Sequence, residues 1–153
     1  MNNISLKSAS ERQYAEACLI FAQKIGLIDD GSLDAVKIRC EKENATRKEK
    51  SEKGETVYGL LHFSLPEYLD YELTRFKLDF VAEIEVIKKN YNYKEISEKE
   101  KKAFYKANRD LFTRFNGDRF RYKEVKMIVK KKIREEEYEN EINNILCQLT
   151  DRQ

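Results

Sequence analysis

Glycine and proline are scarce in this chain, and their scarcity limits the folds that it can form. Only five glycines and one proline, Pro66, occur among 153 residues, while 38% of the residues are charged. Long helices tolerate few breakers, and charged side chains solvate their outer faces, so this composition favours helices over sheets. A chain of this length fits one domain, and its seventeen aromatic residues supply material for a core. The sequence therefore predicts an all-α single domain over residues 1–153.

Three serine–glutamate pairs mark the starts of predicted helices. Each pair has the spacing of a capping box, in which a hydroxyl and a carboxylate satisfy backbone amides at the helix start; the pairs are Ser8–Glu11, Ser64–Glu67 and Ser97–Glu100. Apolar residues then recur at helical spacing. Gly26 ends the first helix, a second helix starts at Ser32, and residues 41–53 continue it without any large apolar side chain.

The most apolar helix is expected at about residues 65–89. One apolar stripe consists of Leu69, Leu73, Phe76, Phe80, Ile84 and Ile87. Four further residues widen it to more than half of the circumference: Tyr68, Tyr71, Leu78 and Val81. Such a helix must be covered on several sides, which predicts a central position. With a long last helix at 122–149, we expect about five helices: an N-terminal pair at about 8–53, a short extended connector at 54–63, and three helices at 64–149.

Residue types suited to catalysis or metal binding are few. His62 is the only histidine and is expected to be a packed or half-exposed ring, and the cysteines, which lack a CxxC motif, are expected to be reduced thiols: Cys18, Cys40 and Cys147. No glycine-rich phosphate loop or nucleophile elbow occurs. The five glutamates at 135–141 are interpreted as a hydrated face. The sequence predicts no enzymatic activity, no metal and no cofactor.

The apolar runs are too short for a membrane span. The longest one, residues 17–22, is far below the roughly 20 residues that a bilayer requires. No signal-peptide pattern precedes it. We therefore expect no membrane span and a cytoplasmic protein, or an extracytoplasmic one if a leader or anchor was removed before Met1.

Positive charge precedes negative charge along the last predicted helix, which is the reverse of what the helix dipole favours. Eight lysines and arginines fall within 119–134, and five glutamates follow within 135–141. Local pairs four residues apart, Lys131–Glu135 and Lys132–Glu136, are one way to compensate. An antiparallel homodimer is the other, through a charged surface that includes Lys123, Lys130, Lys131, Glu135 and Glu136. Nucleic-acid binding by the same cations is disfavoured, because the net charge is only +2 and no groove-entering motif occurs.

Aromatic residues crowd the middle of the chain. Fourteen of the seventeen lie between Tyr58 and Tyr122, and several fall in predicted loops. These loops either fold back onto the core or present rings that line a groove for an extended, apolar polypeptide. The candidate peptide-binding residues are Tyr58, Phe63, Tyr68, Tyr91, Tyr93, Phe115 and Phe120.

Two motifs near the end of the chain carry a family resemblance. The first reads S-x-x-E-x-x-x-F-Y-x-x-N-x-x-x-F over residues 97–112, and the second reads F-x-Y-x-E-V-K over residues 120–126. The block from Glu43 to Arg47, with Val57-Tyr58-Gly59, adds to them. Together they resemble the helical chaperone module of the SurA/PrsA-type peptidyl-prolyl isomerase family.

The resemblance implies a bacterial helical bundle that acts in protein folding and binds unfolded or extended polypeptide. In that family a parvulin isomerase domain is inserted between the two C-terminal helices, and the corresponding place here is the short loop 113–121. The resemblance thus implies a chaperone without isomerase activity. A regulatory or structural adaptor that dimerises or docks one specific protein is the competing hypothesis, and a nucleic-acid binder is the third.

Overall fold

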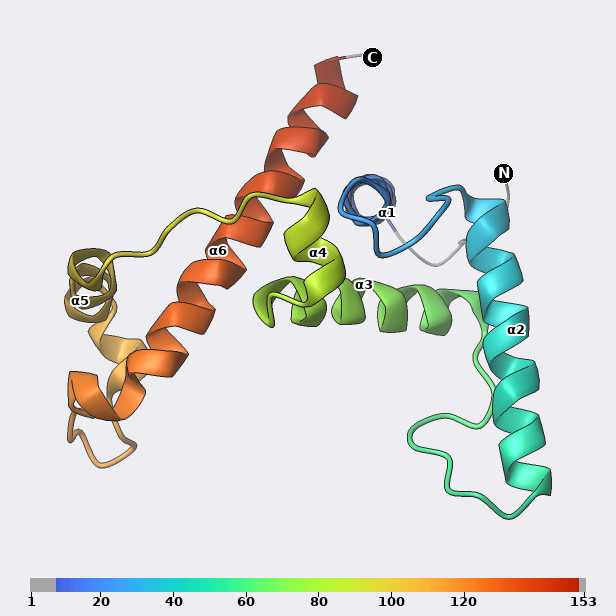
Figure 1. Ribbon diagram of the computed structural model, residues 1–153, viewed down its shortest axis with the longest axis horizontal. Helices are drawn as coiled ribbons and strands as arrows, with labels where there is room; N and C mark the ends of the chain where they lie inside the picture. Colours follow the sequence, from blue (N-terminus) through green and yellow to red (C-terminus); the bar gives the residue numbers. More distant parts are fainter. Residues whose placement is uncertain (1–7, 152–153) are drawn as a thin grey trace.

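The computed structural model describes residues 8–151, and within that range it consists of helices and loops without strands. Figure 1 shows the helices, which are α1 (Ala9–Lys24), α2 (Leu33–Glu52), α3 (Leu65–Val81), α4 (Glu85–Asn90), α5 (Glu98–Ala107), the 3-10 helix η1 (Arg109–Phe112) and α6 (Tyr122–Asp151). This confirms the predicted all-α class. No helix in the described range combines the length and apolar composition needed to cross a bilayer.

Serine side chains cap four of the helices at the positions where the chain enters them. Ser8, Ser32 and Ser97 each accept a hydrogen bond from the backbone N–H three residues later, at 3.1–3.2 Å. The complete capping box forms only at Ser64, whose backbone N–H also donates to the Glu67 carboxylate at 2.9 Å. These caps satisfy amides that the helical ladder leaves without acceptors.

The predicted helix at 65–89 is interrupted, which raises the number of α-helices from the expected five to six. Glu83 adopts a left-handed backbone conformation with φ of 53°, so the chain turns sharply between α3 and α4. A residue other than glycine seldom adopts the left-handed conformation, and no glycine or proline at this position indicates in the sequence that the helix ends. The turn directs α4 back over the body, where Ile87 is fully buried.

Figure 1 shows an arch in which α3 spans the middle, α2 descends from one end and α6 crosses the other. Helix α3 contributes to two clusters of buried side chains. The first lies between α1, α2 and α3 and includes Leu19, Val36, Phe63, Tyr68 and Leu69. The second lies between α1, α3, α4 and α6 and includes Phe21, Ile25, Phe80, Ile87, Tyr138 and Ile142. A smaller third cluster joins η1 to α6 through Phe112, Val125 and Val129.

The connector 54–63 has no regular structure but is fastened to α2. The Asn44 side chain accepts from the Phe63 backbone N–H at 2.7 Å and donates to the Phe63 carbonyl at 2.9 Å. Arg47 donates to the carbonyl oxygens of Tyr58 and Leu60 at 2.6 and 2.7 Å. The polar half of α2 therefore holds the connector in place.

A buried arginine joins α6 to two other segments. Arg134 is 5% exposed, and its guanidinium lies 4.7 Å from the centre of the Tyr93 ring. It donates to the Glu137 carboxylate at 3.1 Å, to Glu83 at 3.1 Å and to the Lys94 carbonyl at 2.6 Å. The α3–α4 turn and the segment that follows α4 are thus fixed to one side chain.

We predict that Arg134→Met lowers the free energy of unfolding by about 3 kcal/mol, because Glu137 and Glu83 lose the cation that compensates them. Urea denaturation of both proteins measures this difference. Arg75→Met is the matched control, since Arg75 forms an exposed ion pair with Asp79 at 3.5 Å and should change stability by less than about 0.5 kcal/mol. Equal effects of the two substitutions contradict the assigned role of Arg134.

Glu98 fastens α5 to the start of α6 from an exposed position. Its carboxylate accepts from Lys126 at 2.7 Å, from Lys101 at 3.1 Å and from the Tyr122 hydroxyl at 2.9 Å. The hydrogen bonds from Lys126, Lys101 and Tyr122 lower the pKa of Glu98 to about 2. The contacts therefore favour the ionised carboxylate in the folded state.

This lowered pKa predicts a pH dependence. The contribution of Glu98 to stability is present above the carboxyl pKa of an unfolded chain, about 4.3, and disappears as the pH falls toward 2. The urea midpoint of Glu98→Gln should therefore be lower than that of the parent protein near pH 7, and the two midpoints should converge on acidification through this window. A difference that persists unchanged at low pH excludes the carboxylate as its source.

Candidate functional site

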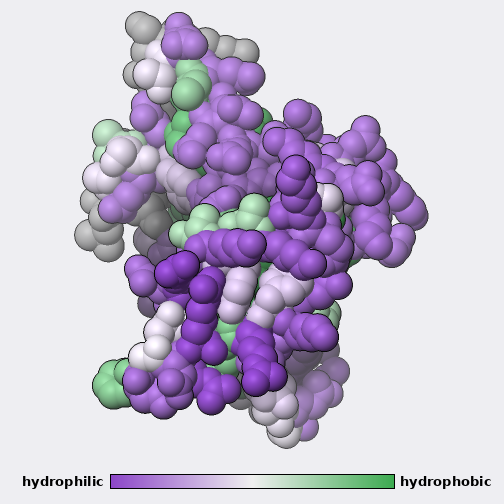
Figure 2. All heavy atoms as spheres, turned by 90° about the vertical axis from the view of Figure 1, so that its left-hand side faces the viewer, coloured by the Kyte–Doolittle hydropathy of each residue, from purple (hydrophilic) through white to green (hydrophobic). Residues whose placement is uncertain are grey.

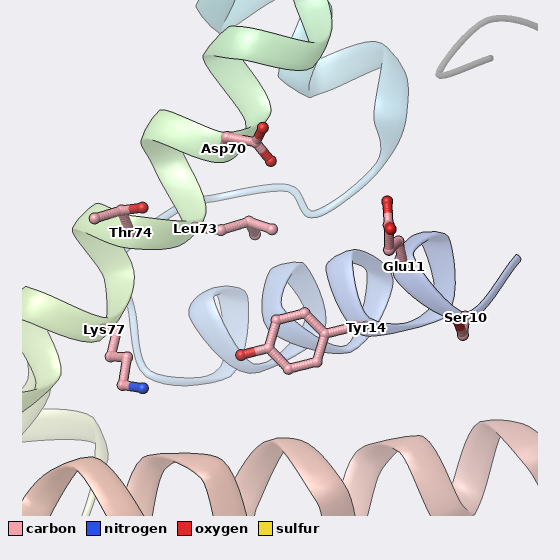
Figure 3. Close-up of a pocket in the computed structure, with 7 residues that line it drawn as sticks. All are labelled: Ser10, Glu11, Tyr14, Asp70, Leu73, Thr74 and Lys77. Atoms are coloured by element: carbon pink, nitrogen blue, oxygen red, sulfur yellow. The ribbon is translucent and has the colours of Figure 1, made fainter. Parts of the chain in front are cut away.

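A surface groove of about 480 Å³ lies between α1 and α3, next to α6. Figure 3 shows the seven side chains that line it: Ser10, Glu11 and Tyr14 come from α1, and Asp70, Leu73, Thr74 and Lys77 come from α3. The two helices run past each other at this point, so the groove has one wall from each.

A hydrogen-bonded triad of Tyr14, Glu139 and Lys77 closes one end of the groove. The Tyr14 hydroxyl donates to both Glu139 carboxylate oxygens at 3.1 and 3.2 Å, and the Lys77 ammonium donates to the same carboxylate at 2.9 Å. Burial, together with the neighbouring Cys18 and Glu139, raises the pKa of Tyr14. The phenol therefore remains a neutral donor, and three helices meet at one carboxylate.

The remaining polar groups of the groove come from both walls. Glu11 on α1 and Asp70 on α3 are exposed carboxylates, and Thr74 adds a hydroxyl. Leu73 and the ring of Tyr14 supply apolar surface between them (Figure 3). Apolar surface with a few convergent polar groups is the usual composition of a small-molecule site.

The seven aromatic residues predicted to bind peptide are not brought together. Phe63 and Tyr68 are buried in the first cluster, Tyr91 and Tyr93 pack against the second, and Phe120 packs against the third. Tyr58 and Phe115 are exposed, in the loops 54–63 and 113–121 at opposite ends of the arch. Among these seven, five rings support packing and two point to solvent from distant loops.

Three of the five glutamates at 135–141 bond to other parts of the chain, so their interpretation as a hydrated face is wrong. Glu137 accepts from the Lys94 backbone N–H at 3.2 Å, Glu139 binds Tyr14 and Lys77, and Glu141 accepts from the Tyr91 hydroxyl at 3.2 Å. Glu136 is the exposed member of the group.

The predicted charged surface on α6 is arranged differently from the expected local pairs. Lys132 bonds to Glu135 at 3.3 Å, three residues away, in place of pairs four residues apart. Lys130 reaches Glu83 at 3.1 Å, while Lys123 and Lys131 are exposed. The homodimer through this surface stays a prediction.

Thiols and the single imidazole do not gather at a site. Cys18 and Cys40 are buried, Cys147 is exposed, and all three are free. His62 is exposed in the connector. Across residues 8–151 no group of three or more histidine, cysteine, aspartate or glutamate side chains is arranged to hold a metal ion.

Solved structures similar to this chain belong to a glycoside hydrolase. The native GH136 lacto-N-biosidase from Eubacterium ramulus matches 89% of the chain with a TM-score of 0.75 and 27% sequence identity, and its selenomethionine derivative matches 90% with a TM-score of 0.74 and 26% identity. This chain spans only 28% of the length of either protein. No protein-family model matches the sequence, and neither does any curated protein.

These likenesses overturn several sequence-based predictions. The resemblance to the SurA/PrsA-type isomerase family is wrong, and with it the chaperone function. The prediction of no enzymatic activity is also wrong, because the similar solved structures are those of an enzyme, a lacto-N-biosidase. In the misleading motif, Phe104 and Tyr105 both pack against Phe112, with ring centres 6.4 and 5.4 Å apart. The motif thus reflects packing between α5 and η1.

The groove residues were not singled out from the sequence. Glu11 was predicted only as a capping residue and Leu73 only as part of an apolar stripe, and Asp70 and Lys77 are charged positions on a helix surface, which are usually solvated. No spacing rule connects α1 with α3, which are more than forty residues apart in the chain.

We predict that Glu139→Gln lowers the free energy of unfolding by about 1 kcal/mol, because a neutral amide bonds less strongly to Lys77 and Tyr14 than a carboxylate does. Chemical denaturation provides the measurement. Glu136→Gln on the same helix is the control, since its exposed side chain should contribute almost nothing. Identical unfolding curves for the two variants argue against the triad.

Proposed function

We propose that this chain is the helical module of a carbohydrate-acting protein of the glycoside hydrolase type. The observation that carries this proposal is the likeness of nearly the whole chain, 89%, to one part of a lacto-N-biosidase at a TM-score of 0.75. The chain spans only 28% of that protein. We therefore propose the carbohydrate-directed activity for a protein that contains such a module, and not for the module alone.

The groove between α1 and α3 supports a role in contacting sugar. A sugar offers many hydroxyls, which carboxylates, hydroxyls and ammonium groups bind well, and it has apolar ring faces that pack on apolar side chains. Glu11, Asp70, Thr74 and Lys77 supply the polar groups, and Leu73 supplies apolar surface. This chemistry matches a neutral saccharide of one or two rings.

The two groove carboxylates favour binding over bond cleavage. Glycoside hydrolysis requires one carboxylic acid that stays protonated until it donates to the leaving oxygen, and apolar surroundings keep it so. Glu11 and Asp70 stand on exposed walls of the groove. We therefore assign them hydrogen bonds to sugar hydroxyls, and place the hydrolytic step in the protein that the module serves.

Titration with lacto-N-biose, followed by amide NMR, tests the proposal. Backbone resonances around the groove should shift with a dissociation constant of about 1 mM, typical of a few exposed hydrogen bonds. Glu11→Gln and Thr74→Val should each weaken binding severalfold, whereas Glu16→Gln, an exposed glutamate of α1 that does not line the groove, should not.

Two outcomes contradict the proposal at different points. If lacto-N-biose shifts only amide resonances outside the groove, the groove is not the sugar-binding site, but the carbohydrate function stands. No response to the disaccharide, combined with no cleavage of an aryl lacto-N-bioside by a longer protein that contains this chain, removes the carbohydrate function itself.

A further inference from the structure

The part of the chain from α5 to the first half of α6 concentrates positive charge. Residues 97–134, named here the basic arm, hold fourteen lysines and arginines against five aspartates and glutamates, a net charge of +9 in a chain whose total is +2. Figure 1 shows α5 and η1 on the side of α6 that faces away from α1. Figure 2 views the molecule from this side and shows a largely hydrophilic face with small, scattered hydrophobic areas, one of them at its lower left edge.

The tip of the basic arm is a tight turn that presents one apolar ring. Thr113 and Arg119 form a single antiparallel bridge, and Gly117 closes the turn with φ of 92° and a hydrogen bond to the Arg114 carbonyl at 2.9 Å. Phe115 stands in this turn with its side chain fully exposed. A large ring that is exposed to water on an ordered turn buries no apolar surface within its own chain. Such exposure is typical of a residue that contacts another molecule.

Aromatic faces, in place of carboxylates, hold the arginines of the tip. The Arg114 guanidinium lies 4.5 Å from the centre of the Phe120 ring, and that of Arg119 lies 4.3 Å from the centre of Tyr105. Within the described residues, none of the five cations at 109–123 takes part in an ion pair; they are Arg109, Arg114, Arg119, Arg121 and Lys123. Two carboxylates, Asp110 and Asp118, share this segment, so it keeps a net charge of +3.

We propose that the tip of the basic arm docks onto an anionic lipid surface. Phe115 inserts among the headgroups and upper acyl chains, while the cations of 109–123 lie against lipid phosphates. Basic residues near an anionic bilayer attract it, and an aromatic ring at the same level adds apolar burial, so the two contributions reinforce each other. This proposal goes beyond the carbohydrate function and does not depend on it.

The shape of the tip favours a lipid surface over a protein partner. A stable protein interface buries roughly 800 Å² on each side and has a core depleted of charge. The tip instead offers one ring at the apex of a narrow turn, with guanidinium groups on both sides of it. A fluid interface accepts such a point contact because lipids rearrange around it.

A tryptophan reporter tests insertion directly. The chain contains no tryptophan, so Phe115→Trp introduces a single fluorophore at the apex. With vesicles of phosphatidylcholine and phosphatidylglycerol its emission should shift to shorter wavelength, and with phosphatidylcholine alone it should not. A blue shift that grows with protein concentration in the absence of vesicles means docking onto a second copy and overturns the proposal.

Three further variants separate the two contributions by vesicle sedimentation. Phe115→Ser should weaken binding to anionic vesicles about tenfold, through loss of apolar burial. Arg121→Gln with Lys123→Gln should also weaken it about tenfold, and neither of these side chains has a ring contact to lose. Leu78→Ser, an exposed apolar position on α3, should leave binding unchanged.

One result overturns insertion: Phe115→Ser leaves vesicle binding intact, and soluble heparin competes fully for the protein. The basic arm would then be a surface that binds any polyanion. Equal binding to neutral and anionic vesicles overturns the electrostatic part. Far-UV circular dichroism of each variant confirms that it remains helical, so that a loss of binding reports the surface.

Discussion

The contacts of Arg134 decide how α6 sits on the rest of the molecule. A buried guanidinium is costly unless several acceptors surround it. Here the acceptors come from three places: the α3–α4 turn (Glu83), the segment after α4 (Lys94) and α6 itself (Glu137). The left-handed conformation of Glu83 is explained by this contact, because it directs the carboxylate toward Arg134 and Lys130. One nitrogen, Arg134 Nε, has no partner, while the Tyr93 ring covers the face of the guanidinium.

The rotation of α6 that Arg134 fixes also positions Glu139 in the triad at the end of the groove. Glu139 follows Arg134 by five residues, which places it about 140° farther around the helix, where it meets Tyr14 from α1 and Lys77 from α3. Tyr138, between Glu137 and Glu139, enters the second cluster beside Phe21 and Phe80. A small rotation of α6 would remove Glu139 from both of its partners. The triad therefore depends on a charge contact made on another side of the same helix.

Sequence patterns predicted the elements of this fold better than their contacts. Serine caps and apolar stripes place the helix starts because both signals are local. The break at Glu83 gives no local signal, since long-range ion pairs stabilise its conformation. The same limit hid the groove: Glu139 and Lys77 resemble any solvated charges until the helices pack. It also explains why Phe63 and Tyr68 were taken for binding residues, because a list of aromatic residues does not show which rings face each other.

The cations at the start of α6 and the glutamates in its second half are compensated by different segments of the described chain. The positive end of a helix dipole lies at its N-terminus, where α6 carries many cations, and this arrangement is unfavourable. Glu124 in the first turn and Glu98 from α5 bring carboxylates to that end, and Glu98 bonds to both Lys126 and Tyr122. Farther along, Glu137, Glu139 and Glu141 are occupied by partners from other segments. Because these carboxylates are paired internally while the five cations at 109–123 form no ion pair among the described residues, the tip of the basic arm keeps a net charge of +3 that no carboxylate compensates.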